Sequence, residues 1–128
     1  MSDPADPQAW VAKAEEDYSV ARSILRRKLP PTSIACFHAQ QCAEKYIKGM
    51  LVSRGKSFPK IHDLLELSTL CEKAGILLAV DTLLLHNLTI YAVQVRYPGD
   101  DPTLEEAKEA VPTAKFIRKL SRKFLGVE

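Results

Sequence analysis

The sequence predicts an all-α protein, an antiparallel four- to five-helix up-and-down bundle. Three observations lead to this fold class. Apolar residues recur at three- and four-residue spacing in five segments, helix start and stop signals bound those segments, and no strand-like alternation persists anywhere. A chain of 128 residues fits one domain. We therefore expect residues 1–128 to form a single helical domain, with a short flexible tail at residues 1–5.

The first predicted helix begins at Asp6-Pro7 and ends at Pro30-Pro31. Asp can accept hydrogen bonds from the free amides of a helix start, and Pro is tolerated in the first turn. The apolar side chains of this helix fall on one stripe, which contains Trp10, Val11, Ala14, Tyr18, Ala21, Leu25 and Leu29. The charged residues lie mostly outside that stripe, so the helix should be amphipathic.

The second predicted helix starts at a cap formed by Thr32 or Ser33, ends near Gly55, and is expected to organise the rest of the chain. Most of its circumference is apolar or small, which is typical of a helix in the middle of a bundle. A narrow polar stripe interrupts this surface, formed by His38, Gln41, Lys45 and Lys48. Because burial makes unpaired polar groups costly, this stripe is the first place to look for chemistry.

The third and fourth predicted helices are shorter. Asp63, with Glu66 three residues later, resembles a capping box and opens the third helix, which Gly75 closes. The fourth begins near residues 80–81 and ends before Pro98, because proline cannot continue a helix ladder.

The fifth predicted helix follows a capping box formed by Thr103 and Glu106. Its early acidic and late basic residues suit the helix dipole. Pro112 removes one backbone donor from the middle of this segment, so we expect a kink or a break near Val111.

The composition is that of an ordinary soluble globular protein. A net charge of +2 gives no global electrostatic argument for nucleic acid or membrane binding, so such binding must rest on a local patch. Three cysteines, Cys36, Cys42 and Cys71, match neither a disulfide framework nor a zinc pattern, and we expect them in the core. No apolar segment is long enough to span a bilayer. The sequence therefore predicts a cytoplasmic protein with no metal and no cofactor.

Four segments, in this order, carry a resemblance. They are the leading tryptophan helix, FHAQQCAEKYIK at 37–48, KIHDL at 60–64 and YAVQVRYP at 91–98. Together they resemble the HEPN domain family (higher eukaryotes and prokaryotes nucleotide-binding). The resemblance implies a stand-alone helical protein that is commonly dimeric and often encoded beside a minimal nucleotidyltransferase. Many such proteins are metal-independent ribonucleases that act as toxins or defence effectors.

The ribonuclease members of this family carry an Arg followed four to six residues later by a His. Arg96 resembles the family arginine, but the chain's histidines, His38, His62 and His86, all precede it. Attack by a 2′-hydroxyl needs a general base, and arginine does not supply one at neutral pH. No catalytic residue is therefore assigned, and the sequence favours a non-enzymatic module.

The polar stripe of the second helix has two interpretations. In the first, Lys45 and Lys48 bind phosphate oxygens while Gln41 or His38 hydrogen-bonds a base or ribose. In the second, Glu44 and Lys48 form an i, i+4 pair and the other polar groups bond to neighbouring helices.

Three further candidates lie outside this stripe. Arg96, beside Tyr97, could bind phosphate, donate to the last helix carbonyls or pair with a core carboxylate. His62 precedes a helix start, where free amides favour anions, but its position is better explained by a helix-flanking surface residue. The last helix carries a basic set that could touch RNA but is better explained as a solvated face: Lys115, Arg118, Lys119 and Arg122.

Three functions remain open on the sequence alone. The favoured one is a dimeric module that binds a nucleotide, a minimal nucleotidyltransferase partner, or both, in a toxin–antitoxin or defence-type system. Its groove is lined by Lys45, Lys48, His62 and Arg96. The second is a ribonuclease toxin that takes its base from His38 or His62. The third is a non-catalytic dimeric interaction domain.

Overall fold

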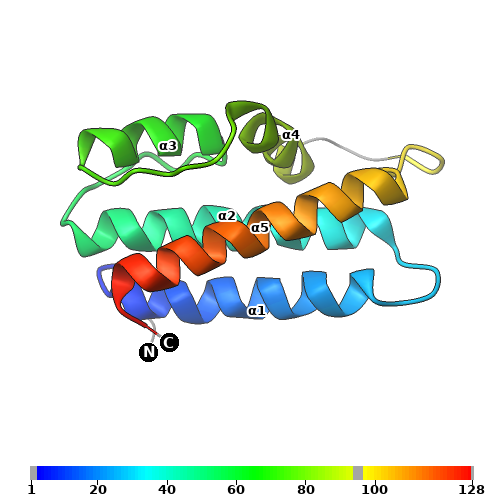
Figure 1. The fold of residues 1–128 in the computed structure, drawn as a ribbon, viewed down its shortest axis with the longest axis horizontal. Helices are drawn as coiled ribbons and strands as arrows, with labels where there is room; N and C mark the ends of the chain where they lie inside the picture. The colour runs from blue at the N-terminus through cyan, green and yellow to red at the C-terminus, as the bar shows by residue number, and fades with distance from the viewer. Residues whose placement is uncertain (1–2, 94–96, 128) are drawn as a thin grey trace.

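The computed structural model describes residues 3–93 and 97–127. Within these ranges the chain forms five helices and no strand (Figure 1). They are α1 (Pro7–Leu25), α2 (Thr32–Ser53), α3 (Leu64–Lys73), α4 (Thr82–Val93) and α5 (Leu104–Leu125). The predicted fold class, an all-α helical bundle, is confirmed.

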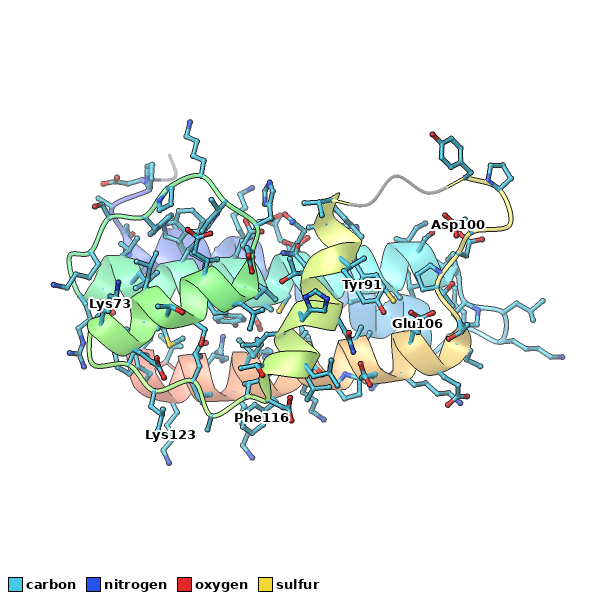
Figure 2. The ribbon with its side chains drawn as sticks, turned by 90° about the horizontal axis from the view of Figure 1, so that it is seen from above. Lys73, Tyr91, Asp100, Glu106, Phe116 and Lys123 are labelled. Atoms are coloured by element: carbon cyan, nitrogen blue, oxygen red, sulfur yellow. The ribbon has the colours of Figure 1, made fainter. Side chains whose placement is uncertain are left out.

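Helix α2 occupies the centre of the bundle and packs against each of the other four helices. The long helices α1 and α5 lie beside it, with α1 running opposite to both α2 and α5, while α3 and α4 cover another side (Figure 1). Helix α4 crosses the long helices steeply (Figure 2). Most of α2 is buried, from Ala35 to Leu51, as its nearly continuous apolar circumference predicts.

The three cysteines lie in the core, as predicted. Cys36, Cys42 and Cys71 are all buried. Burial raises the pKa of the Cys71 thiol to about 11, and it also raises that of Cys42. These thiols therefore stay protonated at neutral pH and act as small apolar side chains.

One predicted helix end and one predicted helix break are wrong. Helix α1 stops at Leu25, and Leu29, which we expected on its buried stripe, is 89% exposed. Pro30 disfavours helical backbone at Leu29, and the chain turns over the cationic residues 26–28 to reach α2. Of the kink or break predicted near Val111, the break is absent, because α5 continues through Pro112. Pro112 lies on the exposed face of α5, where water can hydrate the carbonyl that loses its donor.

Side-chain caps begin three helices where the sequence placed them. Asp6 accepts from the Gln8 amide, Asp63 accepts from the Leu65 amide, and Thr103 makes a complete capping box. The start of α2 differs from the prediction, since its N-cap is Pro31 and makes no side-chain cap. The Thr32 hydroxyl donates instead to the carbonyl of Pro102 at 2.6 Å, which ties this start to the loop before α5.

None of the helices within the described ranges is both long and apolar enough to cross a membrane.

Candidate functional site

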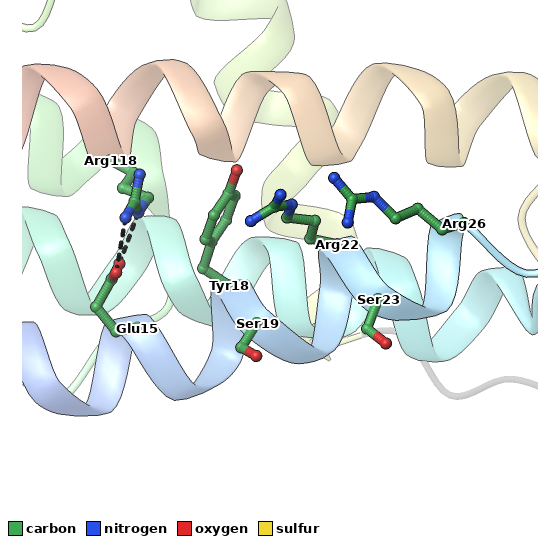
Figure 3. A pocket seen from close by; sticks show the side chains of 7 residues that line it. All are labelled: Glu15, Tyr18, Ser19, Arg22, Ser23, Arg26 and Arg118. Atoms are coloured by element: carbon green, nitrogen blue, oxygen red, sulfur yellow. Dashed lines mark hydrogen bonds and ion pairs between the residues drawn. The ribbon is translucent and has the colours of Figure 1, made fainter.

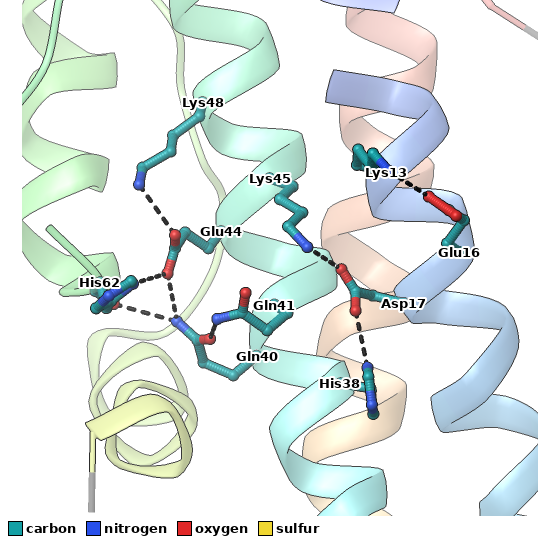
Figure 4. A network of polar contacts seen from close by, with 10 residues as sticks. All are labelled: Lys13, Glu16, Asp17, His38, Gln40, Gln41, Glu44, Lys45, Lys48 and His62. Atoms are coloured by element: carbon teal, nitrogen blue, oxygen red, sulfur yellow. Dashed lines mark hydrogen bonds and ion pairs between the residues drawn. The ribbon is translucent and has the colours of Figure 1, made fainter. Parts of the chain in front are cut away.

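Two buried carboxylates hold the polar stripe of α2 (Figure 4). The first is Asp17 of α1, which is 7% exposed and faces α2. One of its oxygens lies 2.8 Å from Nδ1 of His38, and the other accepts from the Lys45 ammonium at 2.6 Å. The Asp17 cluster, which comprises Asp17, His38 and Lys45, therefore joins α1 to α2 through the polar side chains of their interface.

The second carboxylate is Glu44 of α2, which is 4% exposed. It lies 2.9 Å from the Lys48 ammonium, 2.8 Å from Nδ1 of His62 and 3.0 Å from the amide nitrogen of Gln40. Gln40 also donates to the His62 carbonyl at 3.2 Å, and its own oxygen accepts from Gln41 at 2.7 Å. The Glu44 cluster, formed by these five residues, fixes the connector before α3 onto α2.

Hydrogen bonding keeps Glu44 ionised in spite of its burial. Burial acts to raise the pKa of this carboxyl, but hydrogen bonds from Gln40, Lys48 and His62 outweigh it and hold the pKa below its ordinary value. A buried carboxylate with this many donors is a strong anchor for cations and amides.

The predicted site residues on α2 and before α3 fall into two separate clusters. His38 and Lys45 lie on Asp17, whereas Lys48 and His62 lie on Glu44 and Gln41 reaches Glu44 through Gln40. The i, i+4 pair of Glu44 and Lys48, one of the two interpretations of the stripe, is present.

Of the candidate pair Arg96 and Tyr97, only Tyr97 lies within the described residues. Tyr97 is 69% exposed in the turn before α5 and belongs to neither of the two clusters. Arg96 lies outside the described residues.

Two surface hollows flank Trp10 at the end of the bundle where α1 begins. The larger, of about 740 Å³, is lined by Asp3, Pro4, Ala5, Trp10, Lys48, Val52, Gly55, Lys56, Ser57, Phe58 and Lys60. The smaller, of about 180 Å³, includes Lys45 and shares Trp10 with the larger. The Trp10 and Phe58 rings meet edge to face with centroids 5.8 Å apart, and the Lys48 ammonium lies 5.5 Å from the Phe58 centroid. The two predicted lysines therefore border a pair of adjoining hollows.

A third polar cluster, centred on Glu15 of α1, was not predicted. Arg118 donates to its two oxygens at 2.7 and 2.8 Å (Figure 3). The Tyr46 hydroxyl accepts from Arg122 at 3.2 Å and donates to Glu15. Hydrogen bonding from Arg118 is the main reason that the pKa of Glu15 is lowered.

This Glu15 cluster corrects the prediction of a solvated basic face on the last helix. Arg118 and Arg122 are half-buried and paired, whereas Lys115 and Lys119 are exposed. Glu15 and Arg118 are 103 residues apart, so no local spacing indicated their contact.

The residues in ranges 3–93 and 97–127 contain no group of three His, Cys, Asp or Glu side chains arranged to hold a metal ion.

Comparisons with solved structures agree with this architecture. The chain is similar to TT1696 from Thermus thermophilus, with a TM-score of 0.70 and 27% identity, covering 92% of this chain and 97% of that one. It is also similar to ST0689, described as an archaeal HEPN homologue, with a TM-score of 0.65 and 26% identity, covering 92% and 96% of the two chains.

Sequence comparison gives one shorter and one nearly complete match. A Methanocaldococcus jannaschii protein named "Putative toxin MJ1304" is 39% identical over 49 residues, which span 38% of this chain and only 31% of that protein. The sequence model of the HEPN domain matches residues 7–124. Because this match covers nearly the whole chain and the fold agrees with it, the protein belongs to the HEPN domain family.

Proposed function

We propose that this HEPN protein binds a nucleotide in the larger hollow beside Trp10. The observation that carries the proposal is the meeting of two aromatic rings and three lysines in one concave surface of about 740 Å³. That volume falls within the range of small-molecule sites. We propose further that the protein works with a minimal nucleotidyltransferase partner in a toxin–antitoxin or defence-type system.

The lining of the hollow matches the two halves of a nucleotide. A base has a π-face that stacks on aromatic side chains such as Trp10 and Phe58. Phosphate oxygens attract ammonium groups, and Lys56 and Lys60 are exposed and have no carboxylate partner among the described residues. Lys48 contributes a third positive charge, which Glu44 holds in place.

The system-level part of the proposal rests on kinship. The M. jannaschii relative is named as a toxin, and the matched stretch is a minor part of that protein. A homodimer is proposed on the same basis. Exposed apolar side chains on α2, α4 and α5 are available to such contacts: Phe37, Leu83, Val93 and Phe116. Sedimentation velocity over a hundredfold range of concentration tests the homodimer, and a constant monomer mass would contradict it.

Ligand-dependent thermal stability tests nucleotide binding. ATP, GTP or AMP at about 100 times its dissociation constant should stabilise the fold by about 2.7 kcal/mol and raise Tm. The double variant Lys56→Gln/Lys60→Gln should lose most of this shift, because it removes two unpaired cations from the hollow. Lys48 is unsuited to this test, since its removal would strip a partner from the buried Glu44.

The matched control is Lys28→Gln/Lys73→Gln, which removes the same charge from exposed positions outside the hollow and should keep the full shift. An unchanged Tm with all three nucleotides, or a full shift in the Lys56/Lys60 variant, would contradict nucleotide binding at this hollow.

A second candidate function, ribonuclease activity, is favoured by the Glu44–His62 pair. Glu44 contacts Nδ1 of His62, whose side chain is 52% exposed, so the other ring nitrogen is available to act as a base. Incubation of the protein with a labelled RNA tests this function. Cleavage that persists in EDTA, is lost in His62→Gln and is retained in His86→Gln would establish the ribonuclease activity. If the RNA stays intact, the binding module remains as the proposed function.

A further inference from the structure

Two hollows that share Arg118 together hold more cationic side chains than either of the hollows beside Trp10. The first, of about 470 Å³, is lined mainly by α1, and the second, of about 420 Å³, lies along the end of α5; we call the two together the arginine groove. The cations of this arginine groove are Arg22, Arg26, Arg118, Lys119, Arg122 and Lys123. Glu15 is the one acidic residue in the two linings, so six positive charges less one negative leave an excess of five.

The middle of the arginine groove is rigidly built. Glu15 accepts two hydrogen bonds from Arg118, whose guanidinium carbon lies 4.5 Å from the Tyr18 ring centroid (Figure 3). Two of the five N–H donors of Arg118 are used in this way, which leaves three for another acceptor. The side chain is therefore held in one orientation before any ligand arrives, and little rotamer entropy would be lost on binding.

The outer cations of the groove are unneutralised. Arg22 and Arg26 are exposed, and within residues 3–93 and 97–127 neither has a carboxylate partner. They lie one helical turn apart, about 6 Å along α1. Arg118 and Arg122 have the same spacing on α5, so the groove presents cations in succession on both of its sides.

The chemistry of the lining favours phosphate over other anions. Guanidinium groups match phosphate oxygens with paired N–H donors, and Ser19 and Ser23 also line the hollow along α1. The one aromatic face, Tyr18, is covered by Arg118, so bases have no ring on which to stack. We propose that the arginine groove binds a chain of phosphate groups, which either inorganic polyphosphate or the backbone of a single-stranded nucleic acid can supply. This inference goes beyond the proposed nucleotide hollow, because the two sites share no residue.

Fluorescence anisotropy of a labelled single-stranded RNA, with unlabelled competitors, tests the groove. The wild-type protein should bind the RNA or inorganic polyphosphate. Its affinity for the bound polymer should fall steeply as the salt concentration rises. Arg22→Gln/Arg26→Gln should weaken binding by about tenfold to a hundredfold and lower the slope of log affinity against log salt by about 1 to 2. Both positions are exposed, so this variant should keep the Tm of the wild type.

The control Lys28→Gln/Lys73→Gln loses the same charge outside the groove and should change affinity less than twofold. Binding of RNA alone would assign the source of phosphate to nucleic acid, and binding of polyphosphate alone would assign it to the inorganic polymer. If polyglutamate competed as strongly as the phosphate polymers, the proposal would be overturned, because the groove would then bind any polyanion. Wild-type affinity in Arg22→Gln/Arg26→Gln would overturn it as well. Neither result bears on Lys56 and Lys60, so the nucleotide hollow stands or falls separately.

Discussion

Three carboxylates accept most of the hydrogen bonds that join one side chain to another among the described residues. Asp17, Glu15 and Glu44 each contact at least two cationic or hydrogen-bonding side chains. Asp17 and Glu44 are buried, so removing one of their partners leaves a buried charge with fewer donors, which costs more than the interaction contributed on balance. Substitutions that test function should therefore avoid Lys45 and Lys48 and use exposed cations instead.

Ser121 of α5 differs from these carboxylates, because its polar side-chain group lacks a hydrogen-bond partner among the described residues. Its side chain is fully buried, and its hydroxyl has no hydrogen-bond partner in the part of the chain that the structure describes. Ser121→Ala should therefore raise the free energy of unfolding by about 1 kcal/mol, because a desolvated hydroxyl is removed and its volume is small. Urea denaturation measures this difference. A loss of stability in Ser121→Ala would mean that the hydroxyl has a partner, such as a bound water.

At the scale of elements, local sequence signals predicted where helices start. They did not predict the end of α1 or the continuity of α5. Asp63 and Thr103 act within three residues of their own positions, so a sequence pattern contains them. Pro30 disfavours helical backbone at Leu29, but no local signal marks Leu25 as the last residue of α1. The continuity of α5 through Pro112 depends on which face of the helix meets water.

The same distinction applies to the candidate site. The stripe of His38, Gln41, Lys45 and Lys48 follows from helical periodicity, and the i, i+4 pair of Glu44 and Lys48 is a local interaction that the spacing contains. The partner of Arg118 could not be read in this way, since Glu15 lies on another helix. The hollow beside Trp10 likewise joins α1, α2 and the connector that carries Phe58. Helical periodicity predicts which side chains share a face of a helix, but it does not predict which element packs against that face.

Helices α1 and α2 approach each other closely at Gly49. A Cβ atom added there would lie 3.1 Å from the Cβ of Trp10, which is tighter than ordinary van der Waals contact. Gly49→Val should therefore lower the free energy of unfolding by about 1–3 kcal/mol, since its methyl groups push the start of α1 away. It should also displace Trp10 from the nucleotide hollow and weaken any nucleotide-dependent rise in Tm.

Ala12→Val serves as the control for Gly49→Val, because it adds the same β-branched side chain on the exposed face of α1. Its cost should stay below about 0.7 kcal/mol, which is the helix propensity difference alone. Guanidinium denaturation of the two variants compares them. Equal stability of Gly49→Val and Ala12→Val would contradict a tight contact between these helices.

At the scale of the whole molecule, the Glu15 cluster links the three long helices. Glu15 belongs to α1, Tyr46 to α2, and Arg118 and Arg122 to α5. The Glu44 cluster adds the connector before α3 through His62. Two ionised carboxylates thus join elements that are distant in the sequence, so their protonation should affect the bundle as one unit.

The stability of the bundle should depend on acid in a defined direction. The pKa values of Glu15 and Glu44 are lowered in the folded protein, chiefly by the Arg118 hydrogen bonds for Glu15 and, against burial, by Gln40, Lys48 and His62 for Glu44. Between the lowered folded pKa values and the ordinary value of 4.5, the unfolded chain therefore binds more protons than the folded one. Their contribution to stability is complete above the ordinary value of 4.5 and is lost as pH falls through the lowered folded values.

Urea denaturation between pH 7 and pH 3 measures this dependence with Glu15→Gln as the informative variant. At pH 7 it should be about 1–2 kcal/mol less stable than the wild type, because neutral Gln cannot pair with Arg118 as the carboxylate does. Its stability should also fall less on acidification, so the two curves should converge toward pH 3. Glu72→Gln, at an exposed position on α3, should follow the wild-type curve at every pH. Parallel curves for Glu15→Gln and the wild type would show that the link between α1, α2 and α5 does not depend on the charge of Glu15.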